Sequence, residues 1–192
     1  MRLLCFSGAT AGGLVCDLLN GTKSNITQSG VKCHAHDVFK DVTPYLDNGI
    51  FNETLMSERI NYAQSLVKTN DTLCFGTHTH PSRIPQQFID SFSEILIIST
   101  ISEKCKYFKY LRYLHLYPHI PVYAPAILQD YAPISNCTEI KFSDIVDGSF
   151  VKHYNLDNAH FENWKKTNSY LYDQPISAEI EKFNSILKRK EN

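Results

Sequence analysis

The sequence predicts a single three-layer α/β domain built on a short, mainly parallel sheet. Short apolar runs alternate along the chain with segments of helical spacing, and such alternation is typical of parallel sheets covered by helices. The run 94–99 (EILIIS) is apolar in nearly every position, as expected for a central strand buried on both faces. The 192 residues show no shift in composition that would mark a linker, so we expect one domain over 1–192, with a frayed tail from 188.

Each expected element follows from a local pattern. Strands are expected at the short apolar runs, namely 3–6, 31–34, 72–76, 94–99, 121–123 and 138–142. Helices are expected where apolar residues recur three and four positions apart, namely 11–19, 55–68, 85–92, 102–116, 157–171 and 177–188. The boundaries carry recognisable signals, because Asn20-Gly21 ends the first helix, Pro85 suits a first turn and Ser102 is a good cap.

The composition narrows the classes of partner. The 19 Lys and Arg residues balance the 20 Asp and Glu residues for a net charge of -1, whereas proteins that bind nucleic acid or anionic membranes usually carry a basic excess. The six cysteines occur singly, as expected of reduced thiols in a core. No segment approaches the roughly 20 apolar residues of a membrane span, and the apolar run near Met1 is too short for a signal peptide. We therefore expect a cytoplasmic protein without membrane or nucleic-acid partners.

The segment 103–117 interleaves basic and aromatic residues, a pattern that can bind nucleic acid. On a helix, however, the residues at 107, 110, 111 and 114 form one apolar stripe and the basic residues form the other face. We therefore expect a buried aromatic stripe and a solvated basic face.

Four loops should meet at one edge of the sheet, because right-handed crossovers bring every strand-to-helix connection to the same side. These loops are 7–13, 34–37, 77–81 and 100–102. The first places Gly8, Gly12 and Gly13 around the start of a helix, so that backbone N–H groups and the helix dipole can face an anion. The alternative is a glycine-rich turn that only allows close packing. No Lys-Ser/Thr pair follows Gly12-Gly13, which argues against an ordinary ATPase or kinase.

Three segments carry a resemblance to a known family. They are RLLCFSGATAGGLVCDLL at 2–19, THTHPSRIP at 77–85 and ILIISTISEKCKYFKYLRYLHL at 95–116, and a fainter likeness extends over 140–172. In this order they resemble the first strand, 5′-phosphosulfate loop and helix of the P-loop sulfotransferases, the family's Lys-Thr-His strand end, and the strand and helix that hold the 3′-phosphate. Small, divergent sulfotransferase-like proteins of marine phages and bacteria are included in this family. The resemblance implies a P-loop-like sandwich.

The resemblance also implies an activity and a set of site residues. The protein would bind 3′-phosphoadenosine 5′-phosphosulfate and transfer its sulfuryl group to a hydroxyl of a small-molecule or glycan acceptor. His80 would be the general base, with His78 beside it. The 5′-phosphosulfate cradle would be Ser7, Gly8, Ala9, Thr10, Ala11, Gly12 and Gly13, and the 3′-phosphate contacts would come from Thr100, Ser102, Lys104 and Arg112.

The chain departs from the family pattern at three positions. The first loop has no lysine, His78 stands in place of a second lysine, and Thr100 stands in place of an arginine. A catalytically inactive accessory or assembly protein on the same fold is therefore an alternative.

The histidines support a second alternative, a metal-dependent hydrolase. His34, His36, His78 and His80 form two His-x-His pairs at expected strand ends, and with Asp37 they are residue types that suit zinc. The segment from His78 resembles the JAMM metalloprotease signature, His-x-His-Pro followed by Ser-x-x-Asp. In that register, Phe88 and Ser91 occupy the serine and aspartate positions. Polar strand-end histidines that bond to loop backbone are the structural alternative.

Overall fold

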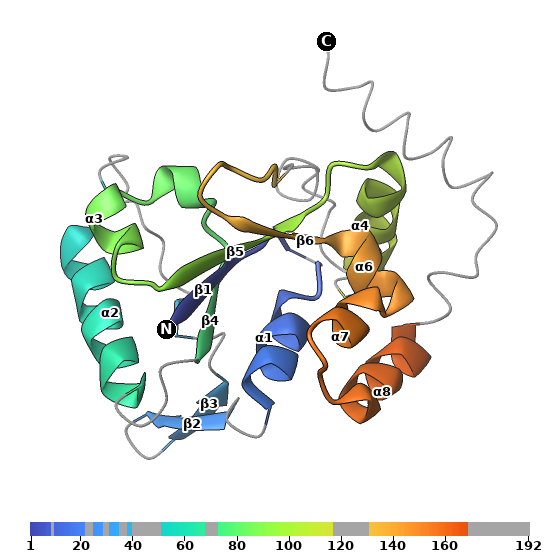
Figure 1. The fold of residues 1–192 in the computed structure, drawn as a ribbon, viewed down its shortest axis with the longest axis horizontal. Coiled ribbons are helices and arrows are strands. Elements are labelled where there is room, and N and C mark those ends of the chain that lie inside the picture. Colours follow the sequence, from blue (N-terminus) through green and yellow to red (C-terminus); the bar gives the residue numbers. More distant parts are fainter. Residues whose placement is uncertain are drawn as a thin grey trace, which may run out of the picture.

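A four-stranded sheet in which all neighbouring strands are parallel forms the middle layer of the computed structural model (Figure 1). Its strands, in spatial order, are β4 (Cys74–Thr77), β1 (Arg2–Cys5), β5 (Glu94–Ser99) and β6 (Thr138–Lys141). The structure describes residues 1–8, 10–21, 25–28, 31–34, 38–39, 51–67, 73–116 and 131–168. The predicted α/β fold with a short parallel sheet is confirmed.

Helices cover both faces of the sheet. One face packs against α1 (Gly12–Asn20), α4 (Glu103–Leu116), α6 (Phe142–Asp147), α7 (Ser149–His153) and α8 (Asn158–Asn168). The other packs against α2 (Glu53–Val67) and α3 (Gln86–Ile89), with the short 3-10 helix η3 (Pro81–Arg83) preceding α3. The two helical layers lie on opposite sides of the sheet in Figure 1.

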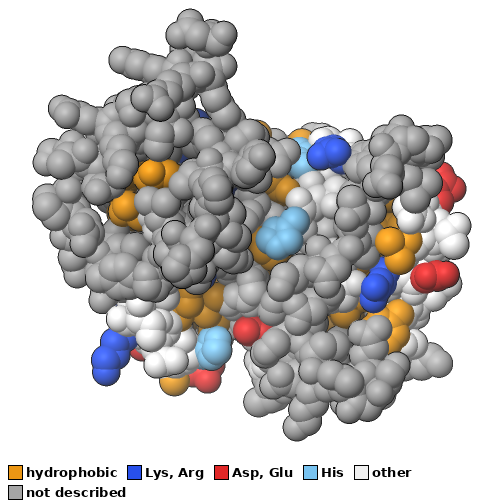
Figure 2. Space-filling view, turned by 180° about the vertical axis from the view of Figure 1, so that it is seen from behind, with side chains coloured by type: hydrophobic (Ala, Val, Ile, Leu, Met, Phe, Trp, Pro, Cys, Tyr) orange, Lys and Arg blue, Asp and Glu red, His pale blue; other side chains and the backbone are white. Residues whose placement is uncertain are grey.

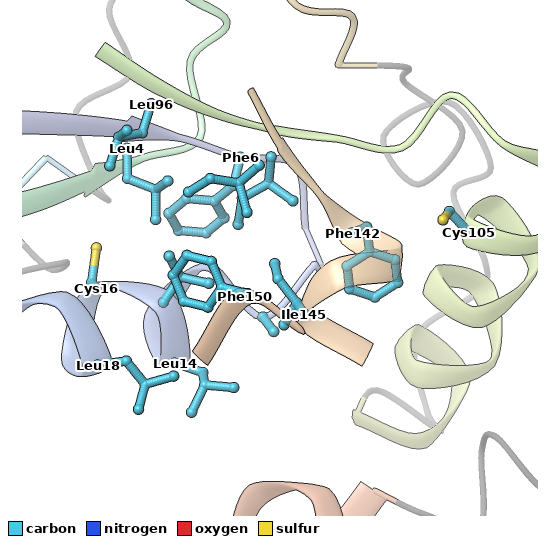
Figure 3. Packing of buried hydrophobic residues seen from close by; sticks show 14 of the residues in the cluster. Leu4, Phe6, Leu14, Cys16, Leu18, Leu96, Cys105, Phe142, Ile145 and Phe150 are labelled. Atoms are coloured by element: carbon cyan, nitrogen blue, oxygen red, sulfur yellow. The ribbon is translucent and has the colours of Figure 1, made fainter. Parts of the chain in front are cut away.

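Successive side chains of each strand point to opposite faces of the sheet and therefore pack in two separate cores. Leu4 and Leu96 belong to the core with α1 and α4, where Figure 3 shows them beside Phe6 and above Cys16. Leu3 belongs to the core with α2 and α3. Because both faces are covered, the central strand β5 is apolar at nearly every position, as its sequence predicts.

A side chain from the end of α1 forms hydrogen bonds with the outer edge of β4, the edge at which a further strand could pair. The Asn20 amide donates to the Cys74 carbonyl oxygen over 2.8 Å, and the Cys74 N–H donates to the Asn20 Oδ1 over 2.7 Å. Asn20 is the last residue of α1 and is buried, so its amide satisfies two backbone groups that would otherwise be left without a protein partner. This pair of bonds joins the end of α1 to the start of β4.

One predicted strand belongs to a different sheet. The strand β3 (Val31–His34) pairs antiparallel with β2 (Asn25–Gln28), and neither strand belongs to the four-stranded sheet. Only two residues separate them, which favours a hairpin, whereas a parallel pair needs a long crossover. The prediction that loop 34–37 meets the other strand-to-helix loops through a shared parallel sheet is therefore wrong. The hairpin follows the C-terminal end of α1 in Figure 1.

Other predicted helices and strands can be compared directly with the structure. The helix expected at 157–171 is observed as α8, and the strand expected at 138–142 as β6, whereas 121–123 and 177–188 lie outside the described residues. On α4, Tyr107 and Tyr110 are buried as predicted, but Lys109 is buried as well, with 1% of its surface exposed. The expectation of a solvated basic face is wrong at that residue, because the packing of α4 extends around more than one stripe.

In the described ranges, no helix combines the length and the apolar character that a membrane crossing requires. The side chains visible in Figure 2 include isolated charges of both signs, without a broad patch of one sign on the described part of that face.

Candidate functional site

The loop between β1 and α1 is held in place by backbone and side-chain hydrogen bonds. The Phe6 N–H donates to the Thr77 carbonyl oxygen over 3.0 Å, which ties the loop to the end of β4. The Thr10 hydroxyl donates to the Ser7 carbonyl oxygen over 2.7 Å and closes the turn. Ala11 precedes the helix in the left-handed conformation, with φ 61°, which an L-residue adopts only when its surroundings enforce it. The loop residue Ala9 lies outside the described residues.

Two glycines of this loop serve different purposes. A Cβ added at Gly12 would lie 2.2 Å from atoms of the Phe6 ring, so Gly12 is required for the packing of Phe6 against α1. A Cβ added at Gly8 would meet no atom within 4 Å. The tight packing predicted as the alternative explanation of the glycine-rich loop is therefore present at Gly12, whereas Gly8 faces open space.

A cavity of about 270 Å³ opens beside the first turn of α1. Its walls come from Phe6, from the start of α1, from Arg112 on α4, and from His160 and Trp164 on α8, with Asp17 on the second turn of α1. The Arg112 guanidinium carbon lies 5.4 Å from the centroid of a Trp164 ring. Among the proposed 3′-phosphate residues whose side chains the structure describes, only Arg112 lines this cavity.

His160 and Trp164 carry no site prediction from the sequence. They lie one helical turn apart on α8, nearly 150 residues after α1, and only the packing of α8 on α1 brings them to the cavity. Their spacing of four residues was the sole local signal, and it is equally typical of any helix face.

The other proposed 3′-phosphate residues occupy different positions. The Ser102 hydroxyl accepts the Cys105 N–H over 3.2 Å and caps α4. Ser102 and Arg112 are about 15 Å apart along the helix axis at 1.5 Å per residue, so one phosphate group cannot bridge them. Ser102 instead lines a pocket of about 70 Å³ with Glu139 and Lys141. The Lys104 side chain lies outside what the structure describes.

At this edge of the sheet, two buried hydroxyl groups have no hydrogen-bond partner within the described part of the chain. They belong to Ser7, after β1, and to Thr100, after β5, whose side chains are 3% and 0% exposed. Thr100 lies two positions after Ile98, which packs in the core on the α1 side. An unpaired buried hydroxyl costs free energy, so each of these groups is a position where a water or a ligand oxygen would relieve that cost.

The two histidines of the β4–η3 loop have different environments. His80 accepts the Ser82 N–H at Nδ1 over 3.2 Å, and its Nε2 lies 3.2 Å from the Ala132 carbonyl oxygen. A carbonyl can only accept, so the neutral ring carries its proton on Nε2, and both nitrogens are used within the protein. His80 caps η3 and ties it to residue 132.

His78 has the opposite tautomer. Its Nδ1 lies 3.2 Å from the Phe6 carbonyl oxygen and therefore donates, which leaves the lone pair of the neutral ring on Nε2. The His78 ring is exposed and packs edge-on against the Phe6 ring, with centroids 4.5 Å apart. Phe6 also lines the cavity, so His78 lies next to the cavity wall.

The described side chains do not bring together the residues that the metal-dependent hydrolase alternative would use as ligands. No group of three or more His, Cys, Asp or Glu side chains suited to a metal ion occurs in the described ranges. The backbone of His34 lies in the β2–β3 hairpin, and His36 and Asp37 lie outside the described residues. His78 and His80 instead bond to Phe6, Ser82 and Ala132.

A comparison with protein-family models, with curated proteins and with solved structures found no match for this chain. The structure by itself establishes an α/β fold with a four-stranded parallel sheet flanked by helices.

Proposed function

We propose that the protein is sulfotransferase-like: it binds a 3′-phosphoadenosine-type nucleotide in the cavity beside α1 and transfers a sulfuryl group to a hydroxyl acceptor. One observation carries the proposal, namely that the first turn of α1 and the Arg112 side chain line the same cavity. A helix start supplies N–H donors and a partial positive charge, and a guanidinium supplies paired donors that match a phosphate.

The remaining walls of the cavity suit the rest of a nucleotide. Trp164 offers an aromatic surface for a base, and His160 adds a polar group. Asp17 lies on the second turn of α1, so an anionic group is expected at the first turn, away from that carboxylate. The volume of about 270 Å³ accommodates a phosphate with part of its nucleoside, and the unpaired Ser7 and Thr100 hydroxyls support an additional polar ligand or water at the same edge of the sheet.

For the transfer step, we assign the base to His78, because its ring packs against Phe6, a residue that lines the cavity, whereas His80 caps η3. The neutral His78 ring donates from Nδ1 to the Phe6 carbonyl oxygen, so its basic nitrogen is Nε2. A bound 3′-phosphoadenosine 5′-phosphosulfate would supply the sulfuryl group. His78 would take the proton of the acceptor hydroxyl, while the start of α1 and Arg112 would stabilise the negative charge left on the nucleotide.

The binding step is tested by titrating the protein with 3′-phosphoadenosine 5′-phosphate, using ADP and inorganic sulfate as reference ligands. We expect saturable binding that weakens about 10- to 150-fold in Arg112→Met, since hydrogen bonds to charged groups contribute about 1.5–3 kcal/mol. Arg59→Met on α2 makes the same change against the other face of the sheet and should leave the affinity unaltered. Equal weakening by both variants, or an absence of saturable binding to the wild-type protein, would contradict the proposal.

A second pair of variants tests the loop itself. Gly8→Glu adds a negative charge where a side chain meets no atom within 4 Å, and Gly8→Ala adds only bulk at the same place. We expect Gly8→Glu to weaken nucleotide binding and Gly8→Ala to preserve it. This pair is preferable to a substitution at Gly12, because a side chain there would displace Phe6 whether or not a ligand binds.

The transfer step needs its own readout. His78→Ala should abolish transfer from 3′-phosphoadenosine 5′-phosphosulfate to a hydroxyl acceptor while nucleotide binding persists. Unchanged transfer in His78→Ala would remove His78 from the mechanism, and binding without any transfer by the wild-type protein would favour an accessory protein that retains only the nucleotide site.

A further inference from the structure

We infer that Tyr131 is a positioning residue that holds His78 in the orientation in which its Nδ1–H donates to the Phe6 carbonyl. The inference rests on the proposed role of His78 as the base. The Tyr131 hydroxyl donates to the backbone carbonyl oxygen of His78, although the two residues are 53 positions apart in the chain.

Tyr131 is anchored on the far side of this bond. Its side chain is 1% exposed and belongs to the core that also contains Phe39 and Phe75. Its ring meets the His80 ring edge-on, with centroids 5.3 Å apart. The next residue, Ala132, accepts from His80 Nε2. Residues 131 and 132 are thus joined to residues 78 and 80 at two successive points.

The peptide groups on either side of His78 are also held. Before it, the Thr77 carbonyl accepts the Phe6 N–H, and after it, the Thr79 N–H donates to the Thr77 hydroxyl over 3.2 Å. The Tyr131 hydroxyl holds the carbonyl of His78 itself. With its backbone fixed at three points, the imidazole is presented to the Phe6 carbonyl, and that acceptor selects the Nδ1–H tautomer. In water the neutral imidazole favours the Nε2–H tautomer, so an Nδ1–H tautomer at His78 would differ measurably from that of a free histidine side chain.

The Tyr131 hydroxyl remains a donor over the working range of pH. Burial raises the pKa of this phenol well above its ordinary value, and the nearby Cys5 raises it further, whereas Arg83 lowers it by a smaller amount. The donor therefore does not titrate away as the pH rises through the range in which an imidazole base becomes active.

The test is Tyr131→Phe, which retains the ring in the core and removes only the hydroxyl. Nitrogen NMR of the His78 imidazole, recorded without nucleotide, should show the Nδ1–H tautomer in the wild-type protein and a shift toward Nε2–H in the variant. Tyr154→Phe removes a half-buried hydroxyl from the other core and should leave the His78 signals unchanged. Nucleotide affinity should stay within about twofold, while kcat falls by at least about tenfold, because a displaced base affects the transfer step and not the nucleotide cavity.

The outcomes separate this inference from the proposed function. Identical His78 signals in the wild type and Tyr131→Phe would overturn the positioning role, whatever the protein binds. An absence of nucleotide binding would overturn the proposed function and leave the tautomer measurement intact. If the variant does not fold, the wild-type spectrum still decides, because a water-like Nε2–H tautomer at His78 contradicts the arrangement that Tyr131 is inferred to hold.

Discussion

The unpaired hydroxyl of Thr100 yields a prediction with an unusual sign. Thr100 is fully buried, and its Oγ1 has no hydrogen-bond partner among the residues that the structure describes. Valine has nearly the same shape and replaces the hydroxyl with a methyl group. Because a buried polar group without a partner costs about 1–3 kcal/mol, Thr100→Val should raise the free energy of unfolding by about 1–2 kcal/mol, although most core substitutions lower it. The melting temperature should rise by about 2–8 °C.

The matched control is Thr10→Val. Thr10 is also buried, but its hydroxyl donates to the Ser7 carbonyl oxygen over 2.7 Å. The same chemical change there removes an existing hydrogen bond to the Ser7 carbonyl oxygen, so it should lower the free energy of unfolding by about 1–3 kcal/mol. Urea denaturation followed by circular dichroism measures both variants, and an unchanged m-value indicates that only stability has changed.

The pair of variants can refute the reasoning directly. A Thr100→Val variant less stable than the wild type by more than about 1 kcal/mol would show that the Thr100 hydroxyl has a partner, such as a buried water. The predicted stabilisation would then be wrong. If Thr100→Val is more stable but binds 3′-phosphoadenosine 5′-phosphate more weakly, the hydroxyl contributes to the ligand site at the expense of the empty protein's stability.

Three further predictions concern stability. Asn20→Ala should lower the free energy of unfolding by about 2–5 kcal/mol in urea denaturation, because the two Cys74 backbone groups lose their hydrogen bonds of 2.7 and 2.8 Å. A loss below about 1 kcal/mol would mean that water replaces the Asn20 amide. Gly148→Ala should destabilise the protein and weaken nucleotide binding, since it combines φ 83° with a Cβ 2.8 Å from Phe161 on α8. Gly21→Ala, at φ 57° and ψ -133° with open space, should cost about 1–3 kcal/mol through backbone strain alone. Burial raises the pKa of the Cys5 thiol, and Cys137 and Cys74 raise it further, so above about pH 9 the folded state retains a proton that the unfolded state releases. The free energy of unfolding should therefore fall as the pH rises above about 9. Cys5→Ala should reduce the slope of the free energy of unfolding against pH by up to about 1.4 kcal/mol per pH unit, and an unaltered slope would count against this assignment.

The sequence was informative wherever a property is local. The continuous hydrophobicity of Glu94–Ser99 indicated a strand covered on both sides, and the alternation around it indicated the parallel sheet. The loop 7–13 was correctly expected at the start of α1, because the pattern of a strand, a glycine-rich turn and a helix lies within about twenty residues. These features depend on spacings of two or of three to four residues, which the chain displays without reference to distant segments.

The features that only the tertiary structure decided involve contacts between distant segments. Val31–His34 was recognised as a strand, but its apolar pattern does not specify a partner, and the observed partner is the more polar β2. Arg112 and Trp164 share a cavity wall only because α4 and α8 pack on the same side of the sheet. His78 and His80 look equivalent in the sequence, yet one bonds to Phe6 and the other to Ala132. The sequence by itself indicated most of the described elements and the edge of the sheet at which loops 7–13, 77–81 and 100–102 meet. Packing across long separations decided the partner of Val31–His34 and which residues line the cavity.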